Sequence, residues 1–461
     1  MMRLLVRMPL TRSLGLLLLV AGLCLGTLAL PVQAAISGAA RHDIVVLRTG
    51  TDPFTTLVAQ PVASASPARP LPTGLLDRTG HTLYVATLQD DVHSVVRAID
   101  AVSGRTLRSV TVEGHFLTQN GDYPPALLGG PPSGGTAWAP SVAVAGGPHR
   151  LPRALPAAPV PDPTATVAAL SFNGRWLALR DALPGQPNTR AIVINTSTMR
   201  VAATIRLTGR YGLDAINGDG SRLYLLKILG PQAYEVRAYD TRQGRLEAQP
   251  LREKGEADTT LRGVSWTRAW SPRGDWLFTL YVQPGRQGAF IHALGVEHHA
   301  VHCIMLPDQG PAAAADLAHY TLAVAPDGRT LYAVNPVLGR MVVVRGGLPY
   351  GARTGITLAR RAGSPARMLT PAALSRDGGT MFVATDQGVW AVDTRALRVR
   401  ATYLPGPRIS SVALSRDGQR LYALQPDQDQ VTALDVAGGR LLGRVTVDAT
   451  ARGIERILTH D

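Results

Sequence analysis

Four arginines stand at a similar distance before a glycine in an apolar-turn-apolar stretch. Three lie 10 or 11 residues before that glycine and one lies 12 residues before it. The four are Arg210, Arg262, Arg367 and Arg408. Guanidinium groups bind carboxylate or phosphate through paired hydrogen bonds, so several arginines gathered at one place would bind a small anionic ligand. The alternative is that each arginine pairs with a neighbouring acid such as Asp214 or Glu455.

A second group of side chains could ligate a metal. His298, His299, His302 and Cys303 lie within GVEHHAVHCIML. The segment stands where an outer strand is expected, and on a strand His298 and His302 would be about 13 Å apart. Because a structural zinc site needs four converging ligands, we predict no metal site here.

No catalytic motif is recognisable. The sequence lacks a nucleophile elbow, a phosphate-binding glycine loop, CxxC and HExxH, so we assign no catalytic residue and no cofactor. Asp100, Asp240, Asp393 and Asp435 recur in register, which indicates that they shape turns by bonding nearby backbone groups. Binding is expected instead in the longer connectors at 113–125, 249–268, 306–320 and 346–370.

The elements that position these residues come from a repeat. Seven times an apolar stretch runs into a turn with glycine and then into a second apolar stretch, as in AVAPDGRTLYAVN (323–335). Asp-Gly between apolar strands predicts a β-hairpin, because glycine adopts positive φ without strain. The turn glycines are Gly80, Gly174, Gly220, Gly274, Gly328, Gly378 and Gly418.

A second hairpin follows most copies, and two hairpins make one four-stranded antiparallel sheet. Sheets repeated every 40–54 residues or so predict an all-β protein, a β-propeller. We expect seven blades, with 42–62 and 452–458 closing the ring. The alternative is that both chain ends together build an eighth blade. The Pro- and Gly-rich stretch 114–165 is expected to be an irregular insertion or a degenerate blade.

The motifs P-D-G-x-T-L-Y (326–332) and S-R-D-G-x-R-L-Y (415–422) resemble the YVTN-type β-propeller repeat, a relative of WD40-like propellers. The resemblance covers most of residues 71–450. Proteins of this group include binding proteins, cell-surface proteins, lactonases and dehydrogenase subunits, so the resemblance implies a fold more than an activity.

Residues 1–34 are similar to a secretory leader, with Arg3, Arg7 and Arg12 before an apolar run and Val32-Gln33-Ala34 as a cleavage site. An uncleaved membrane anchor is the alternative. We therefore expect an extracytoplasmic protein, with closing strands and a Pro/Ala/Ser linker at 35–70 and the propeller at 71–461.

The formal charge is +14, and removal of the three leader arginines leaves 14 − 3 = +11. The cations are scattered arginines rather than a basic run, which argues against a nucleic-acid partner. A protein, a glycan or a small anionic ligand is the expected partner, and a membrane only if the leader is retained. The function we expect is a non-enzymatic binding scaffold. The alternatives are a lactonase-like hydrolase, which needs acid, His and Arg side chains around the channel, and a subunit of a redox enzyme.

Overall fold

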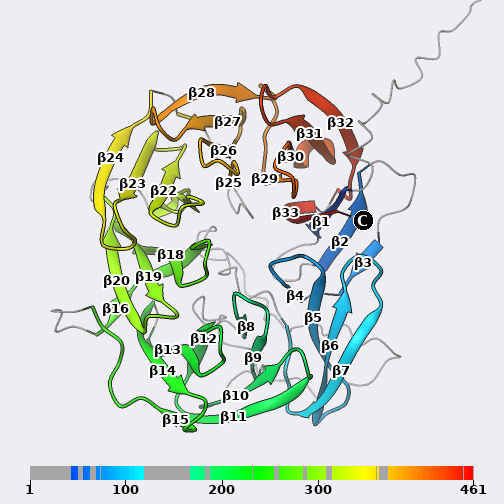
Figure 1. Cartoon of the computed structure of the whole chain (residues 1–461), viewed down its shortest axis with the longest axis vertical. Coiled ribbons are helices and arrows are strands. Elements are labelled where there is room, and N and C mark those ends of the chain that lie inside the picture. Colours follow the sequence, from blue (N-terminus) through cyan, green and yellow to red (C-terminus); the bar gives the residue numbers. More distant parts are fainter. Residues whose placement is uncertain are drawn as a thin grey trace, which may run out of the picture.

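The computed structural model describes residues 43–49, 56–62, 69–72, 74–118, 167–181, 187–230, 232–253, 259–283, 288–307, 314–359, 361–362, 372–449 and 451–459. Their strands form eight antiparallel sheets that surround a common centre as the blades of a β-propeller (Figure 1). The predicted all-β propeller is therefore confirmed. One short helix, α1 (Ala314–Leu317), and a 3-10 turn, η2 (Pro426–Gln428), interrupt the strands. Neither is long and apolar enough to cross a lipid bilayer, and the same holds for every described helix.

Blades are numbered here in chain order, each from its innermost strand outward. Blade 1 contains β4 (Leu75–Leu76), β5 (Thr82–Leu88), β6 (His93–Asp100) and β7 (Thr106–Glu113). Blade 2 contains β8 (Ala168–Leu170), β9 (Trp176–Arg180), β10 (Asn188–Asn195) and β11 (Arg200–Thr208). Blade 3 contains β12 (Tyr211–Ile216), β13 (Arg222–Gly230), β14 (Ala233–Asp240), β15 (Arg245–Leu246) and β16 (Leu261–Arg262). Blade 4 contains β17 (Val264–Trp270), β18 (Trp276–Gln283), β19 (Gly288–Gly295) and β20 (Ala300–Met305).

The other four blades follow the same order. Blade 5 contains β21 (Thr321–Val324), β22 (Thr330–Asn335), β23 (Arg340–Arg345) and β24 (Ala352–Thr357). Blade 6 contains β25 (Ala372–Leu374), β26 (Thr380–Thr385), β27 (Gly388–Asp393) and β28 (Arg398–Tyr403). Blade 7 contains β29 (Ser411–Leu414), β30 (Arg420–Gln425), β31 (Gln430–Asp435) and β32 (Leu441–Thr446). Blade 8 contains β33 (Ala451–Thr459), β1 (Asp43–Thr49), β2 (Thr56–Pro61) and β3 (Arg69–Leu71).

Blade 8 decides the blade count. The structure shows eight blades, the alternative to the seven preferred from the sequence, because the two chain ends build a complete sheet of their own. β33 supplies the innermost strand and pairs with β1 along its whole length. Arg69–Leu71, which the composition assigned to a Pro/Ala/Ser linker, instead forms the outer strand and pairs with β2. Proline at position 70 suits an edge strand, where its missing N–H leaves no gap in the ladder.

The turn glycines are placed as the hairpin pattern predicts. Each one lies between the first and second strands of its blade, and the seven φ angles are all between 69° and 79°. A second constraint acts on several of them. A Cβ on Gly220 would lie 2.4 Å from the Trp176 ring of blade 2, and one on Gly418 would lie 2.7 Å from Arg376 of blade 6. Glycine is thus required both for its positive φ and because the preceding blade packs onto the turn. We call the face that carries these turns the turn face and the opposite face the loop face.

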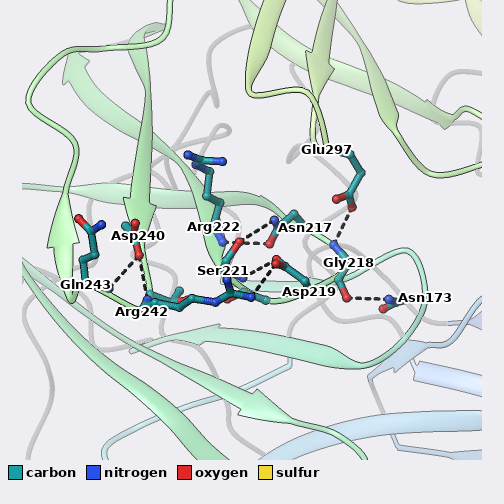
Figure 2. A network of polar contacts seen from close by, with 12 residues as sticks. Asn173, Asn217, Gly218, Asp219, Ser221, Arg222, Asp240, Arg242, Gln243 and Glu297 are labelled. Atoms are coloured by element: carbon teal, nitrogen blue, oxygen red, sulfur yellow. Dashed lines mark hydrogen bonds and ion pairs between the residues drawn. The ribbon is translucent and has the colours of Figure 1, made fainter.

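Polar contacts link the turns of neighbouring blades (Figure 2). The Asn173 side chain of blade 2 donates to the Gly218 carbonyl at 2.7 Å, and the Gly218 N–H donates to Glu297 of blade 4 at 2.6 Å. The Asp240 carboxylate accepts the backbone N–H groups two and three residues later, at 2.9 and 2.8 Å. Asp100, Asp393 and Asp435 likewise accept backbone N–H groups of their own turns, which confirms that the recurring aspartates shape turns.

The hydrophobic core is divided among the interfaces between blades. Each of eight buried clusters joins residues of two adjacent blades, and together they cover all eight interfaces of the ring. The cluster between blades 8 and 1 contains Val46 and Leu458 together with Leu83 and Val85. The ring is therefore sealed by apolar packing at its closing joint as well as elsewhere.

An ion pair reinforces the closing joint between blades 7 and 8. The Asp43 carboxylate, fully buried on β1, accepts a hydrogen bond from Arg420 Nε at 2.9 Å and another from the Tyr422 hydroxyl. Burial and the carboxylate both raise the pKa of Tyr422, burial being the larger cause, so the phenol stays protonated and donates. The Arg420 guanidinium is nearly as buried and also lies 3.1 Å from Asp417.

We predict that Asp43→Ala destabilises the protein strongly, because it leaves a buried guanidinium without its main partner. The free energy of unfolding should fall by about 3–5 kcal/mol. Urea denaturation followed by tryptophan fluorescence measures the change. Asp219→Asn, which removes an exposed pair with Arg242 on the turn face, is the matched control and should cost less than about 1 kcal/mol. Equal losses in the two variants would contradict the prediction.

Candidate functional site

Three inner strands depart from regular pairing: β33 of blade 8, which shifts register twice against β1, and the adjacent inner strands of blades 3 and 4. In blade 3 the register shifts between Leu213 and Ala215, so that Asp214 is the extra residue of a β-bulge in β12. In blade 4 the register shifts between Ser265 and Arg268 in β17. The described inner strands of blades 1, 2, 5, 6 and 7 pair with their second strands without such a shift. Bulges re-aim side chains and are common beside active sites.

The bulges bring Asp214 and Arg268 together across the blade boundary. Arg268 Nη2 lies 3.0 Å from Asp214 Oδ1, and Arg268 Nη1 donates to the Asp214 carbonyl at 3.3 Å. The Asp214 side chain is 3% exposed and the Arg268 side chain 15%, so the pair is largely shielded from solvent. An ion pair in such surroundings interacts more strongly than one at the surface. We refer to Asp214 and Arg268 as the wall pair.

His292 lies behind the wall pair. It is 1% exposed, and neither ring nitrogen has a hydrogen-bond partner among the described residues. Burial lowers the pKa of His292 to about 4, with Asp214 and Glu253 acting in the opposite direction and Arg268 in the same direction. The imidazole is therefore neutral at pH 7.

Strand register explains how His292 reaches this place. Arg268, Thr279, His292 and Cys303 are opposite one another on β17, β18, β19 and β20. Residues directly opposite in antiparallel strands point to the same face of the sheet, so these four form one row from the centre of the ring toward its rim. That face packs against blade 3, where Tyr234 stacks on Tyr281 with ring centroids 5.0 Å apart. Burial raises the pKa of both tyrosines, so both hydroxyls stay protonated.

The other histidines of blade 4 have separate acidic neighbours. The outer strand begins at Ala300, so His298 and His299 lie in the preceding turn and not on the strand expected from the sequence. His298 Nε2 lies 3.4 Å from Asp275, His299 Nε2 lies 2.9 Å from Glu247, and His302 contacts Glu253. Among the described residues no three His, Cys, Asp or Glu side chains are grouped so that they could hold a metal ion.

The four predicted arginines are only partly brought together. Arg210 and Arg262 flank the β13–β14 connection of blade 3: Ile228 donates to the Arg210 carbonyl at 2.9 Å, and Arg262 on β16 is paired with Ala233. Both arginines are exposed. Arg408 precedes the inner strand of blade 7, across the ring from blade 3 (Figure 1), and its guanidinium contacts both carboxylate oxygens of Asp427. Arg367 lies outside the described residues, as do the predicted leader and the predicted insertion beyond Thr118.

The sequence pattern did not single out Arg268 or His292 as site residues, and it considered Asp214 only as a partner for another arginine. A signal was present in the inner strands YGLDAI and VSWTRAW, which place one charged residue in an otherwise uncharged stretch. Nothing in those letters shows that two bulges turn the two charges toward each other.

Comparison with known proteins finds similarity among solved structures alone. No family model and no curated protein matches the chain. A solved dihydro-heme d1 dehydrogenase, NirN, in complex with DHE is similar over 93% of this chain and 77% of its own, at 14% identity and a TM-score of 0.47. AztD from Citrobacter koseri is similar over 91% and 98%, at 11% identity and a TM-score of 0.49. The periplasmic gluconolactonase PpgL from Pseudomonas aeruginosa is similar over 82% and 99%, at 15% identity and a TM-score of 0.40.

The predicted non-enzymatic scaffold is corrected by these comparisons. Two of the similar structures carry the names of enzymes, a dehydrogenase and a gluconolactonase, which the scaffold prediction did not anticipate. At these identities the similarity concerns the β-propeller fold and identifies no reaction.

The buried imidazole generates a prediction about stability and pH. An unfolded histidine binds a proton near pH 6.5, whereas His292 in the folded protein does so only near pH 4. Its contribution to stability is therefore fully present above pH 6.5 and is lost as the pH falls toward 4, by roughly 3 kcal/mol. Urea denaturation of the wild type and His292→Gln between pH 7.5 and 4 should show a shallower decline in the variant. His81→Gln, at an exposed position, should decline like the wild type. A parallel decline in all three proteins would contradict the buried neutral state.

Proposed function

We propose that this protein is an extracytoplasmic β-propeller hydrolase that opens the ring of a small sugar-derived lactone. The wall pair carries the proposal, because two bulged inner strands hold a shielded carboxylate and a guanidinium 3.0 Å apart. Together with His292 these residues supply an acid, an Arg and a His, as the lactonase alternative requires, although His292 is buried between blades 3 and 4 and does not line the channel. Membership of the YVTN-type repeat group and export by the leader at residues 1–34 belong to the same proposal.

The chemistry follows from the two charges. Hydrolysis of a lactone requires a base that takes a proton from water as the water attacks the carbonyl carbon. It also requires donors for the oxyanion that forms. In the proposed reaction Asp214 acts as the base and Arg268 donates to the oxyanion. Breaking the ring C–O bond releases an alkoxide, which takes the proton of the newly formed carboxylic acid. The product is then a hydroxy carboxylate, and the proton taken from water stays on Asp214.

The wall pair should be necessary for lactone hydrolysis. We expect the purified chain to open glucono-δ-lactone faster than buffer does. Asp214→Asn and Arg268→Gln should each lower kcat/KM by about 100-fold or more, since each removes a charge needed in the transition state. A pH-indicator assay in weak buffer measures ring opening.

Asp219→Asn is the matched control, because it removes an ion pair on the turn face of the same blade and should leave the rate unchanged. Wild-type rates in Asp214→Asn, or a wild type no faster than buffer across a panel of aldonolactones, would contradict the proposed function.

The two exposed arginines of blade 3 suggest that an anionic lactone is preferred. Arg210 and Arg262 flank one connection, and Lys227 stands opposite Tyr211, the residue after Arg210. We expect the double variant Arg210→Gln/Arg262→Gln to raise KM for a phosphorylated sugar lactone about 10-fold while leaving KM for the neutral lactone unchanged. The effect should shrink at high salt. Arg242→Gln on the turn face is the control. An equal change for both substrates would show that these arginines do not recognise charge.

A further inference from the structure

Thr279, His292 and Cys303, the row of residues behind the wall pair, have no role in the chemistry described so far. His292 is buried at 1% exposure, and it faces charges at both ends of the row. Asp214 on β12 and Arg268 on β17 stand on the inner side. Glu253, which follows the short outer strand β15 of blade 3, stands on the outer side. Tyr281 on β18 packs edge-on to the imidazole, with ring centroids 6.1 Å apart.

Both ring nitrogens of His292 need hydrogen-bond partners that the described side chains do not provide. A buried polar group without a partner costs about 1–3 kcal/mol, and native proteins usually satisfy such groups with ordered water. The row is polar enough for water, since Thr279 and Cys303 are opposite His292 on the two flanking strands.

Glu253 connects the row to solvent at the rim of the ring. Its carboxylate accepts the backbone N–H of Cys303 at 3.1 Å and contacts His302. The Glu253 and His302 side chains are 27% and 21% exposed, so solvent reaches both. Polar groups thus extend from the wall pair through Thr279 and His292 to a carboxylate and an imidazole in contact with solvent.

We propose that His292, with water bound at its ring nitrogens, transfers protons between Asp214 and the rim carboxylate Glu253. The proposal rests on the proposed function, because hydrolysis leaves a proton on Asp214 that must be released before the next turnover. That proton passes to water, the water passes a proton to one imidazole nitrogen, and the other nitrogen releases its proton toward Glu253. Each transfer leaves His292 neutral in its other tautomer, which a turn of the imidazole ring reverses, and Glu253 releases its proton to solvent. No oxidant or reductant is needed.

A test that does not depend on activity uses nuclear magnetic resonance of the ring N–H of His292 in protein labelled with nitrogen-15. If water reaches the ring, this N–H should exchange with solvent within seconds at pH 7. Glu253→Gln should slow the exchange at least 10-fold. Phe290→Leu, which alters packing on the same face of β19 but removes no titratable group, should not slow it. A ring N–H protected for hours in the wild type would overturn the proposal, even if the protein hydrolyses lactones.

A second test uses the pH–rate profile of lactone opening. His292→Gln and Glu253→Gln should each lower kcat about 10-fold with little change in KM, and added imidazole should restore part of the rate in His292→Ala. If His292→Ala does not fold, the loss of kcat in His292→Gln alone measures the effect of removing the imidazole. A Phe290→Leu rate near that of the wild type would separate proton transfer from packing. Wild-type profiles in both proton-path variants would overturn the proposal, whereas absence of hydrolysis in every protein, with fast N–H exchange, would overturn only the proposed function.

Discussion

Pairing of the two chain ends is the constraint on which the rest of the structure depends. Every blade buries its apolar faces against two neighbours, so a ring of sheets is stable only when no blade is left with an open side. β33 and β1 come from opposite ends of the described chain and pair over seven register positions. The buried Asp43–Arg420–Tyr422 contact then fixes the blade they form to blade 7. With the ring closed, each blade holds its neighbours in register, and charged residues on inner strands of different blades are kept in fixed relative positions.

The wall pair depends on this rigidity. An exposed ion pair formed by two flexible side chains contributes little, because ordering the side chains offsets the attraction. Asp214 and Arg268 stand instead on strands whose backbones are fixed by the cluster between blades 3 and 4. The broken outer edge of blade 3 contributes too. β15 ends at Leu246, and the chain that follows places Glu247 and Glu253 against His299 and His302 of blade 4. One interface therefore combines apolar packing, a shielded ion pair and two histidine–glutamate contacts.

The sequence predicted the fold well because the fold depends on local signals. Gly220 and Gly328 mark turns by a backbone requirement that only glycine meets easily, and Asp240 shapes its turn through contacts within three residues. The sequence did not decide between seven and eight blades, because the eighth blade depends on pairing between segments about 400 residues apart. The site was harder to predict for the same reason. A bulge depends on how two strands pair, and no single residue in YGLDAI indicates that β12 contains one. Arg408 shows that regular spacing alone can mislead. Its spacing matches that of the other arginines, yet its guanidinium contacts Asp427 within its own blade.

Closure by β33 also sets an order of events during synthesis. Residues 451–459 are made after every other described strand, and they supply the innermost strand of blade 8. Until they emerge, β1 lacks its main partner, and apolar residues such as Val46 and Leu83 lack the cover of Leu458. A nascent chain can therefore form hairpins and pack blade against blade as it grows. Until β33 is made, the ring stays open, and the apolar faces at the open joint are exposed. Closure of the ring therefore depends on the last described strand and not on any of the blades made before it.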